Sequence, residues 1–207
     1  MNKKLLTLSA AAFAAAVTLA GCAADSGSTP VPGMSHGGSG MSHGSSAPAA
    51  SADHNAADVK FAQMMIPHHA QAVEMSDMIL AKTEIPASVT TLATKIKEAQ
   101  GPEIDTMTGW LKSWNEPTEM ASGHSMSGHG MSGMMDEAAM KELQAAQGTD
   151  AARLFLTQMI AHHEGAVTMA KAETSEGKNA EAVDLSKKIV TAQEAEIKKM
   201  QELLGTL

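Results

Sequence analysis

The sequence predicts an all-α protein, a four-helix bundle made of two copies of one helical hairpin. Residues 61–75 match residues 155–169 at a constant offset of 94, and residues 92–111 match residues 185–204 at an offset of 93. Each copy is predicted to form a helix, a short connection and a second helix. Because a repeated unit of this kind buries its apolar face against its neighbour, two such hairpins most simply form a four-helix bundle.

Helical spacing of the apolar residues supports this fold. In the first copy, intervals of four and three residues define a seam that consists of Phe61, Met65, His68, Ala72, Met75 and Ile79. Such alternation is typical of a helix that packs along another helix. Pro67 and Pro102 interrupt otherwise helical patterns, so we expect each to kink its helix.

The pattern also predicts where the elements begin and end. Residues 56–114 form the first hairpin, which turns near Glu84, and residues 137–207 contain a short helix followed by the second hairpin. Pro86 is a signal for a helix start. Gly148 is interpreted as a helix stop.

Residues 1–21 have the composition of a secretion signal, with Lys3 and Lys4 ahead of an apolar stretch over residues 5–20. The stretch ends in Leu-Ala-Gly-Cys, which resembles a bacterial lipobox. That resemblance implies cleavage before Cys22 and a lipid on its sulfur. We therefore expect an exported lipoprotein, anchored to a membrane of the cell envelope. An ordinary signal peptide followed by a chance cysteine is the alternative.

Composition excludes several functions. Removing Lys3 and Lys4 with the signal takes the formal charge from −8 to −10, which argues against a nucleic-acid partner. No glycine-rich phosphate loop and no Gly-x-Ser-x-Gly elbow occurs. Cys22 is the only cysteine, so an intramolecular disulfide is impossible, and a lipid-bearing Cys22 leaves no thiol for a metal or for catalysis.

Two stretches are rich in glycine, serine, methionine and histidine: residues 22–55, a tether, and residues 115–136, a loop. Their composition buries too little apolar surface to fold, so both are expected to be disordered. Met-Ser-His-Gly occurs twice in the tether. The interpretation as loose soft-metal ligands covers Met34, His36, Met41, His43, His124, Met126, His129, Met131, Met134 and Met135. A solvated linker of biased composition is the alternative.

Each predicted hairpin gathers potential metal ligands at one level. Antiparallel packing about the turns sets the histidine pairs opposite a glutamine and a glutamate of the next helix. The candidate ligands are Met65, His68, His69, Glu103 and Met107 in the first hairpin, and Met159, His162, His163, Glu196 and Met200 in the second. Met75 and Met169 lie two turns away, about 10 Å along the helix, and belong to a second layer or to the core.

A purely structural role for these residues is the alternative interpretation. Methionine is a flexible core filler, and a buried histidine is often only hydrogen-bonded. Four histidines in two duplicated pairs, each level with a glutamate, are nevertheless costly to bury without a function.

Ligand chemistry selects the metal. Thioether sulfur is a soft ligand that suits Cu(I) and Ag(I), and imidazole extends the range to Cu(II). In an oxidising exported compartment thiolates oxidise, so methionine and histidine are more durable ligands. The ligand chemistry therefore predicts a site for a soft metal ion, Cu(I) or Ag(I), with Cu(II) accommodated by the imidazoles.

Two alternatives remain. A di-iron or di-manganese oxidase of this shape needs Glu-x-x-His on two helices. Here the positions three residues before the histidines hold Met65, Ile66, Met159 and Ile160. A structural helical lipoprotein would suit the bundle but leaves the methionine and histidine stretches unexplained.

The motifs also resemble a known family. Met-Ile-x-His-His-x-x-Ala-Val-x-Met occurs at residues 65–75 and again at 159–169. Ala-x-x-Ile-x-x-x-Gln-x-x-Glu-Ile-x-x-Met occurs at residues 93–107 and, with Ser186 in the first place, at 186–200. Both patterns are similar to those of the ferritin-like domain-of-unknown-function 305 family. The resemblance covers about residues 56–204 and implies a four-helix bundle. It also implies a relation to exported copper-binding members. Together with the ligand chemistry, the resemblance leads us to expect a copper-binding protein without catalytic activity, Cu(I) being favoured, for sequestration or for handover to another copper-handling protein. The insertion near residues 120–135 departs from the family pattern.

Overall fold

The computed structural model describes residues 53–119 and 131–207. This part contains five α-helices and no strand, so the all-α prediction is confirmed. In chain order the helices are α1 (Ala56–Leu80), α2 (Ala87–Ser113), α3 (Glu137–Ala145), α4 (Gly148–Glu176) and α5 (Ala180–Leu204). Outside the described residues lie the predicted signal, Cys22, and the candidate ligands Met34, His36, Met41, His43, His124, Met126 and His129.

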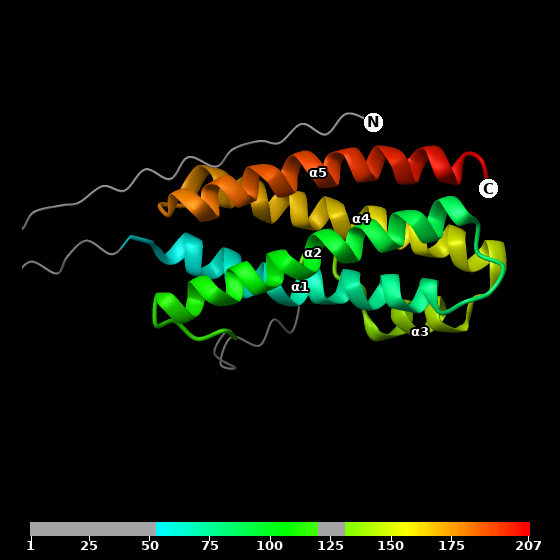
Figure 1. The fold of residues 1–207 in the computed structure, drawn as a ribbon, viewed down its shortest axis with the longest axis horizontal. Coiled ribbons are helices and arrows are strands. Elements are labelled where there is room, and N and C mark those ends of the chain that lie inside the picture. The colour runs from blue at the N-terminus through cyan, green and yellow to red at the C-terminus, as the bar shows by residue number, and fades with distance from the viewer. Residues whose placement is uncertain (1–52, 120–130) are drawn as a thin grey trace, which may run out of the picture. The chain divides into compact units, whose positions relative to one another are not determined.

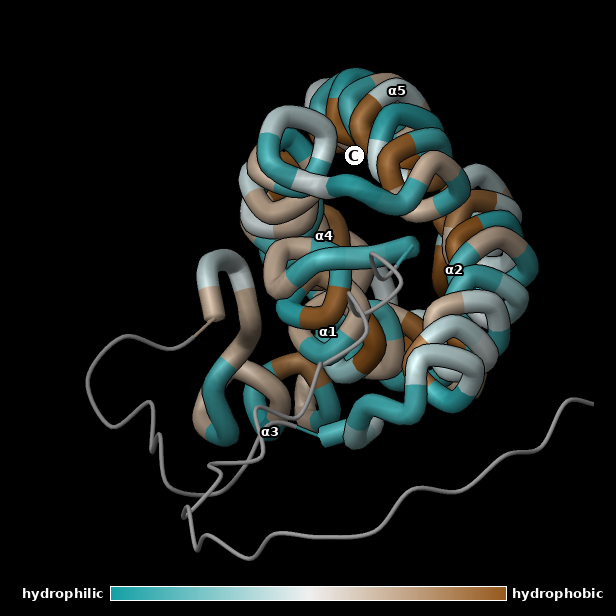
Figure 2. The backbone as a smooth tube through the Cα atoms, turned by 90° about the vertical axis from the view of Figure 1, so that its left-hand side faces the viewer, coloured by the Kyte–Doolittle hydropathy of each residue, from teal (hydrophilic) through white to brown (hydrophobic). Residues whose placement is uncertain are grey.

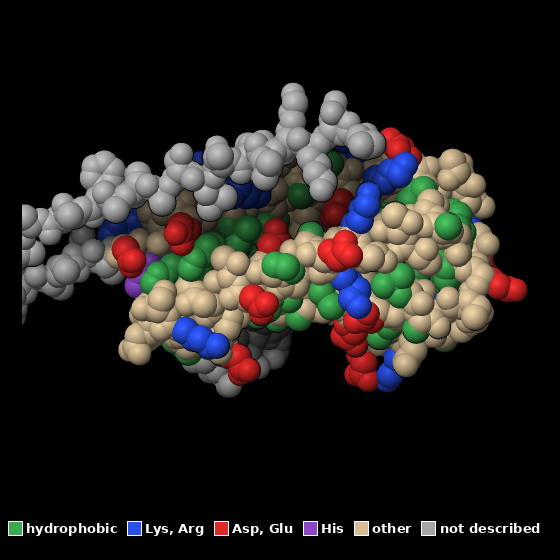
Figure 3. Space-filling model, viewed as in Figure 1, with side chains coloured by type: hydrophobic (Ala, Val, Ile, Leu, Met, Phe, Trp, Pro, Cys, Tyr) green, Lys and Arg blue, Asp and Glu red, His purple; other side chains and the backbone are tan. Residues whose placement is uncertain are grey.

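Two antiparallel hairpins make the bundle, as the duplication predicts. α1 packs along α2 and α4 along α5, and the hairpins meet mainly through α1 and α4, whereas α2 and α5 barely touch (Figure 1). On the face shown in Figure 3, hydrophobic side chains line a furrow between α2 and α5, and charged side chains lie on the exposed helix surfaces. No helix in the described ranges has the length and apolarity to cross a membrane.

The helix boundaries follow local rules. Asn55 caps α1 by accepting hydrogen bonds from the amides of Ala57 and Asp58. The first hairpin turns at Glu84, whose φ is +60°. Gly148 was expected to stop a helix; instead it opens α4 with a φ of +52°, a conformation that favours glycine.

Both internal prolines lie inside helices that continue past them. α1 runs through Pro67 and α2 runs through Pro102 as single elements. Pro67 directly precedes His68, so the histidine pair of the first hairpin stays in helical register with the seam.

The hydrophobic core consists of two clusters. One, the α3 cluster, joins α1, α2, α4 and α5 to α3 and includes Met75, Ile79, Leu143, Phe155, Met159 and Met200. The other, the Phe61 cluster, includes Phe61, Met65, Met107, Leu111, Ala166 and Ile189. Viewed along the bundle, hydrophobic positions face the space between the helices (Figure 2). The start of α1 packs against the end of α4, so these two helices are antiparallel.

α3 covers one half of the outer groove between α1 and α4. Its Leu143 is fully buried in the α3 cluster. Gln158 of α4 donates to the carbonyl of Ala139 at 3.1 Å, and Lys82 donates to the carbonyl of Gln144 at 2.7 Å. Among the described residues the first hairpin has no counterpart of α3, so in this part of the chain the cover breaks the two-fold symmetry of the repeat.

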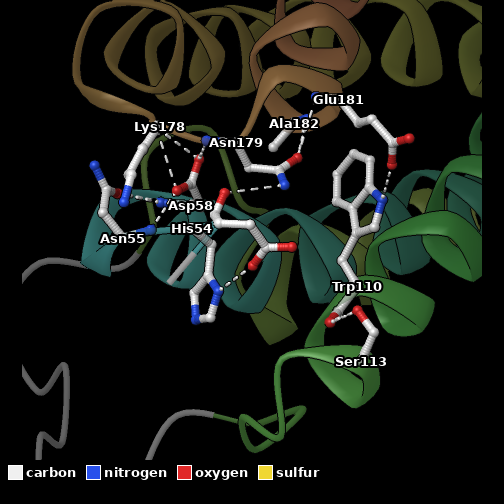
Figure 4. Close-up of polar contacts among 10 residues, drawn as sticks. His54, Asn55, Asp58, Trp110, Ser113, Lys178, Asn179, Glu181 and Ala182 are labelled. Atoms are coloured by element: carbon white, nitrogen blue, oxygen red, sulfur yellow. Dashed lines mark hydrogen bonds and ion pairs between the residues drawn. The ribbon is translucent and has the colours of Figure 1, made fainter. Parts of the chain in front are cut away.

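A buried aspartate fastens the two hairpins at one end of the bundle (Figure 4). The Asp58 carboxylate accepts the backbone N–H of Lys178 at 3.0 Å and of Asn179 at 2.9 Å, both in the turn between α4 and α5. Asn55 Nδ2 donates to the carbonyl of Glu176 at 2.9 Å beside it. The first turn of α1 is thereby bonded to the second hairpin.

Glu173 faces this aspartate and is only 2% exposed. Burial, followed by the neighbouring Asp58, raises the pKa of the Glu173 carboxyl to about 8. Burial also acts to raise the pKa of Asp58, but hydrogen bonds from Glu173 and from the backbone amides outweigh it and lower that pKa. Neither Glu173 oxygen accepts a hydrogen bond within the described residues. The two opposite pKa shifts are those expected when a neutral Glu173 carboxyl faces an ionised Asp58 and can donate to it.

We predict that Glu173→Gln stabilises the protein at alkaline pH. Because the folded pKa of about 8 lies above the ordinary 4.5, the wild type is favoured below pH 4.5 and loses this stability as pH rises through 8. Between pH 5 and 8 the loss is roughly 3 kcal/mol. The glutamine cannot ionise and keeps that stability. Urea unfolding of both proteins at the two pH values measures the difference, with exposed Glu176→Gln as control; equal losses in wild type and variant would contradict the prediction.

Candidate metal centre

Four histidines form one polar layer between the two hydrophobic clusters. His68 and His69 come from α1, and His162 and His163 come from α4. All four are at most 1% exposed. Consecutive helical residues point about 100° apart, so one histidine of each pair faces the opposite hairpin and the other faces the second helix of its own hairpin. These four residues are termed the histidine layer.

The outer histidines each contact a glutamate. His69 Nε2 lies 2.8 Å from Glu103 Oε2, and His163 Nε2 lies 2.7 Å from Glu196 Oε2. The two contacts are equivalent in the duplicated hairpins. Both glutamates thus lie level with the histidines, as predicted. Their carboxylate oxygens contact histidine nitrogens, which is the arrangement of a residue that orients a metal-binding histidine and does not itself bind the metal.

The inner histidines meet each other across the hairpins. The ring centroids of His68 and His162 are 3.7 Å apart, with the planes tilted by 42°. The sequence predicts a separate ligand set in each hairpin, and this contact brings the two sets together. His163 continues the row, because its ring centroid lies 6.3 Å from that of His162.

Burial keeps the inner pair neutral. Burial, reinforced by the neighbouring histidines, lowers the pKa of His68 to about 4 and that of His162 to about 2. Both imidazoles are therefore neutral at pH 7, and a neutral imidazole has a lone pair available to a metal ion.

Five ring nitrogens of the layer lack any hydrogen-bond partner within the described residues. They are Nδ1 of all four histidines and Nε2 of His162. Leaving a buried polar atom unpaired costs about 1–3 kcal/mol. His68 Nε2 is satisfied, since it donates to the carbonyl of Ser132 at 3.2 Å. Three histidines thus have Nε2 held by an oxygen and Nδ1 free, which is the usual arrangement of a metal-binding histidine and its outer partner.

The predicted methionine ligands lie on both sides of the layer. Met65 and Met107 are buried together in the Phe61 cluster, and Met159 and Met200 are buried together in the α3 cluster. Met65 and Met159 are each one helical turn from a histidine pair. The layer is therefore flanked by thioether sulfur in each hairpin.

The remaining methionine candidates are dispersed. Met75 is fully buried in the α3 cluster, and Met169 lines a cavity of about 200 Å³ beside Phe61 and Met64. Met131 and Met134 are half-buried, and Met135 packs against the α3 cluster.

Across the described residues, no group of three or more histidine, cysteine, aspartate or glutamate side chains is arranged to hold a metal ion. A metal site at the layer would therefore need other donors beside the imidazoles. Two amide oxygens, those of Gln100 and Gln193, are also buried without a partner. Both glutamines were placed level with the histidines by the sequence pattern, but neither was proposed as a ligand.

The family follows from comparison with known proteins. Residues 58–204 match the family model described as domain of unknown function (DUF305). The chain belongs to the DUF305 family. No curated protein matches it.

Solved structures of the family share the fold. A DUF305 protein from Streptomyces coelicolor, which is taken to be secreted, is 37% identical, with a TM-score of 0.67 over 72% of this chain and 91% of the other. A DUF305 fragment from Deinococcus radiodurans is 32% identical, with a TM-score of 0.65 over 74% and 98%.

CopM is a third structural relative of this DUF305 chain. In its Cu(I)-bound form it is 32% identical, with a TM-score of 0.60 over 72% of this chain and 96% of CopM. CopM has also been solved with Cu(II) and with Ag. The family resemblance expected from the duplicated His-His motif is confirmed.

We predict that His162→Leu makes the protein less sensitive to acid. The pKa of His162 is lowered from 6.5 to about 2, so the unfolded chain takes up a proton as pH falls below 6.5 while the folded chain does not. By pH 5 this costs the wild type roughly 2 kcal/mol. Urea unfolding at pH 7 and pH 5 should show the variant gaining that amount relative to wild type, with His54→Leu as control. An unchanged difference between the two pH values would contradict the prediction.

Proposed function

We propose that this DUF305 protein binds copper at the histidine layer and carries no catalytic activity. The observation that carries the proposal is the set of buried, unpaired Nδ1 atoms on histidines whose Nε2 atoms are held by Glu103, Glu196 and Ser132. A buried nitrogen atom without a hydrogen-bond partner destabilises a folded core, and a metal ion bound to these Nδ1 atoms would supply the missing partner.

The donor types favour Cu(I), with Ag(I) and Cu(II) as further ions. Neutral imidazole and thioether are the neighbouring donors, and this soft combination suits monovalent copper and silver. His68 and His162 supply the central nitrogens, and Met65 and Met159 supply sulfur from the flanking clusters. The binding of Cu(I), Cu(II) and Ag by CopM supports this assignment.

In this proposal Glu103 and Glu196 orient His69 and His163 instead of binding the ion. The same contacts disfavour a di-iron or di-manganese oxidase, because such a site requires several carboxylates directly on the metal. Both glutamates that reach the layer are engaged with imidazole.

The proposed cellular role is sequestration or handover of copper at the cell envelope. Residues 1–21 would direct export, and lipid on Cys22 would attach the chain to the membrane. The methionine and histidine residues of the tether and loop would add weaker sites, since ordering a flexible segment around an ion costs entropy.

The double variant His68→Leu/His162→Leu tests the site. Anaerobic titration with Cu(I), Ag(I) and Zn(II) should show the tightest Cu(I) site of the wild type weakened by at least about 100-fold, or roughly 3 kcal/mol. The fold should survive, because apolar side chains of similar size replace polar groups that mostly lack partners.

His54→Leu, which changes a histidine outside the layer, is the matched control and should retain the tight site. Tight Zn(II) binding without Cu(I) or Ag(I) binding in the wild type would overturn the soft-metal assignment. Full Cu(I) affinity in the double variant would overturn the assignment to the layer.

A further inference from the structure

Residues 131–135, termed the strap, lie across α1 and α4 at the level of the histidine layer. Ser132 accepts a hydrogen bond from His68, as described above. The backbone of Met135 is bonded twice to Gln71 of α1: Gln71 Nε2 donates to the Met135 carbonyl at 2.8 Å, and the Met135 N–H donates to Gln71 Oε1 at 2.7 Å. The strap is therefore held to α1 on both sides of Gly133.

The strap also packs closely against α4. A Cβ atom at Gly165 would lie 1.9 Å from the Ser132 oxygen, so only glycine leaves room for the strap at this position. Gly133, with a φ of +83°, also passes close to α4, because a Cβ there would lie 2.6 Å from the Ala161 carbonyl oxygen and 2.8 Å from that of His162.

Gln71 and Gly165 are equivalent positions of the two repeats, at the same offset of 94 as the histidines. The two copies have diverged here, and each residue serves the same segment: one bonds the strap, and the other makes space for it. A surface loop that crossed the bundle without a role would require neither a fixed pair of hydrogen bonds nor a glycine in a helix.

The strap determines the chemistry of His68. A carbonyl oxygen only accepts hydrogen bonds, so the bond to Ser132 places the proton of His68 on Nε2. The lone pair then resides on the buried Nδ1. With the strap in place His68 and His162 are at most 1% exposed. The strap thus orients His68 and lies against the backbone of His162.

We propose that Gln71 and Gly165 are positioning residues that seat the strap on the histidine layer, and that the seated strap slows the exchange of an ion bound there. The part of this inference that concerns ion exchange rests on the proposed function. Competing ligands reach the inner histidines when the strap lifts, so the rate of release follows the strength of its seating.

Gly165→Ala displaces the strap without weakening α4, since alanine favours helix more than glycine does. Gly109→Ala is the matched control: it is the same change in a helix, at a position where a Cβ would meet nothing within 4 Å. The first measurement is hydrogen exchange of the Met135 amide in metal-free protein. Exchange should become at least about tenfold faster in Gly165→Ala and stay unchanged in Gly109→Ala.

The second measurement is stopped-flow release of Ag(I) from loaded protein to a competing chelator. Release should be at least about tenfold faster in Gly165→Ala and, independently, in Gln71→Ala. Gln63→Ala is the control for the latter, because Gln63 also donates from α1 to a loop carbonyl, that of Pro117 at 2.8 Å, away from the layer.

Three outcomes would overturn the proposal, each at a different point. Unchanged Met135 exchange in Gly165→Ala would show that Gly165 does not seat the strap. Faster hydrogen exchange of the Met135 amide with an unchanged rate of Ag(I) release would show that the strap does not control ion release, and would leave the proposed metal binding intact. Ag(I) uptake by the His68→Leu/His162→Leu variant equal to that of the wild type would overturn the proposed function and, with it, the role of the strap in ion release; the seating of the strap by Gly165 would still be decided by the Met135 amide.

Discussion

Four imidazole rings buried in the middle of a helical bundle constrain everything around them, because a neutral imidazole has one nitrogen that donates and one that accepts. Glu103, Glu196 and the Ser132 carbonyl each take one Nε2 contact. The apolar clusters on either side exclude water and keep the inner pair unprotonated. What is left over is a set of buried nitrogens without hydrogen-bond partners, a costly arrangement that the proposed soft metal ion would resolve.

Some contacts of the histidine layer are repeated in both hairpins, and others occur in one hairpin only. The contacts of His69 with Glu103 and of His163 with Glu196 repeat in both hairpins. α3 and the strap have no second copy in residues 53–119 and 131–207, and both belong to the connection between the hairpins. As a result His68 has a fixed tautomer, whereas His162 has two unpaired nitrogens. Two positions that are identical in sequence are therefore chemically different.

The hairpins and the His–Glu pairs could be predicted because they depend on short-range rules. Helical spacing and one turn near Glu84 suffice to bring Glu103 level with His69. The contact between His68 and His162 depends on how the two hairpins pack against each other. The spacing of apolar residues within one hairpin does not specify that packing. The strap has no periodicity, and its signal was the difference between Gln71 and Gly165 at equivalent positions. Gly148 was assigned to the wrong helix end because glycine serves both boundaries.

The fastening around Asp58 has a mechanical consequence. The described residues just ahead of α1 are bonded to the opposite hairpin: Asn179 Nδ2 donates to the Asp53 carbonyl at 3.3 Å, and Asn55 Nδ2 donates to the Glu176 carbonyl at 2.9 Å. A pull on the N-terminal side is therefore shared by both hairpins at this end. Such tension loads the turn between α4 and α5 before it reaches the middle of α1, so the histidine layer is insulated from strain along the chain.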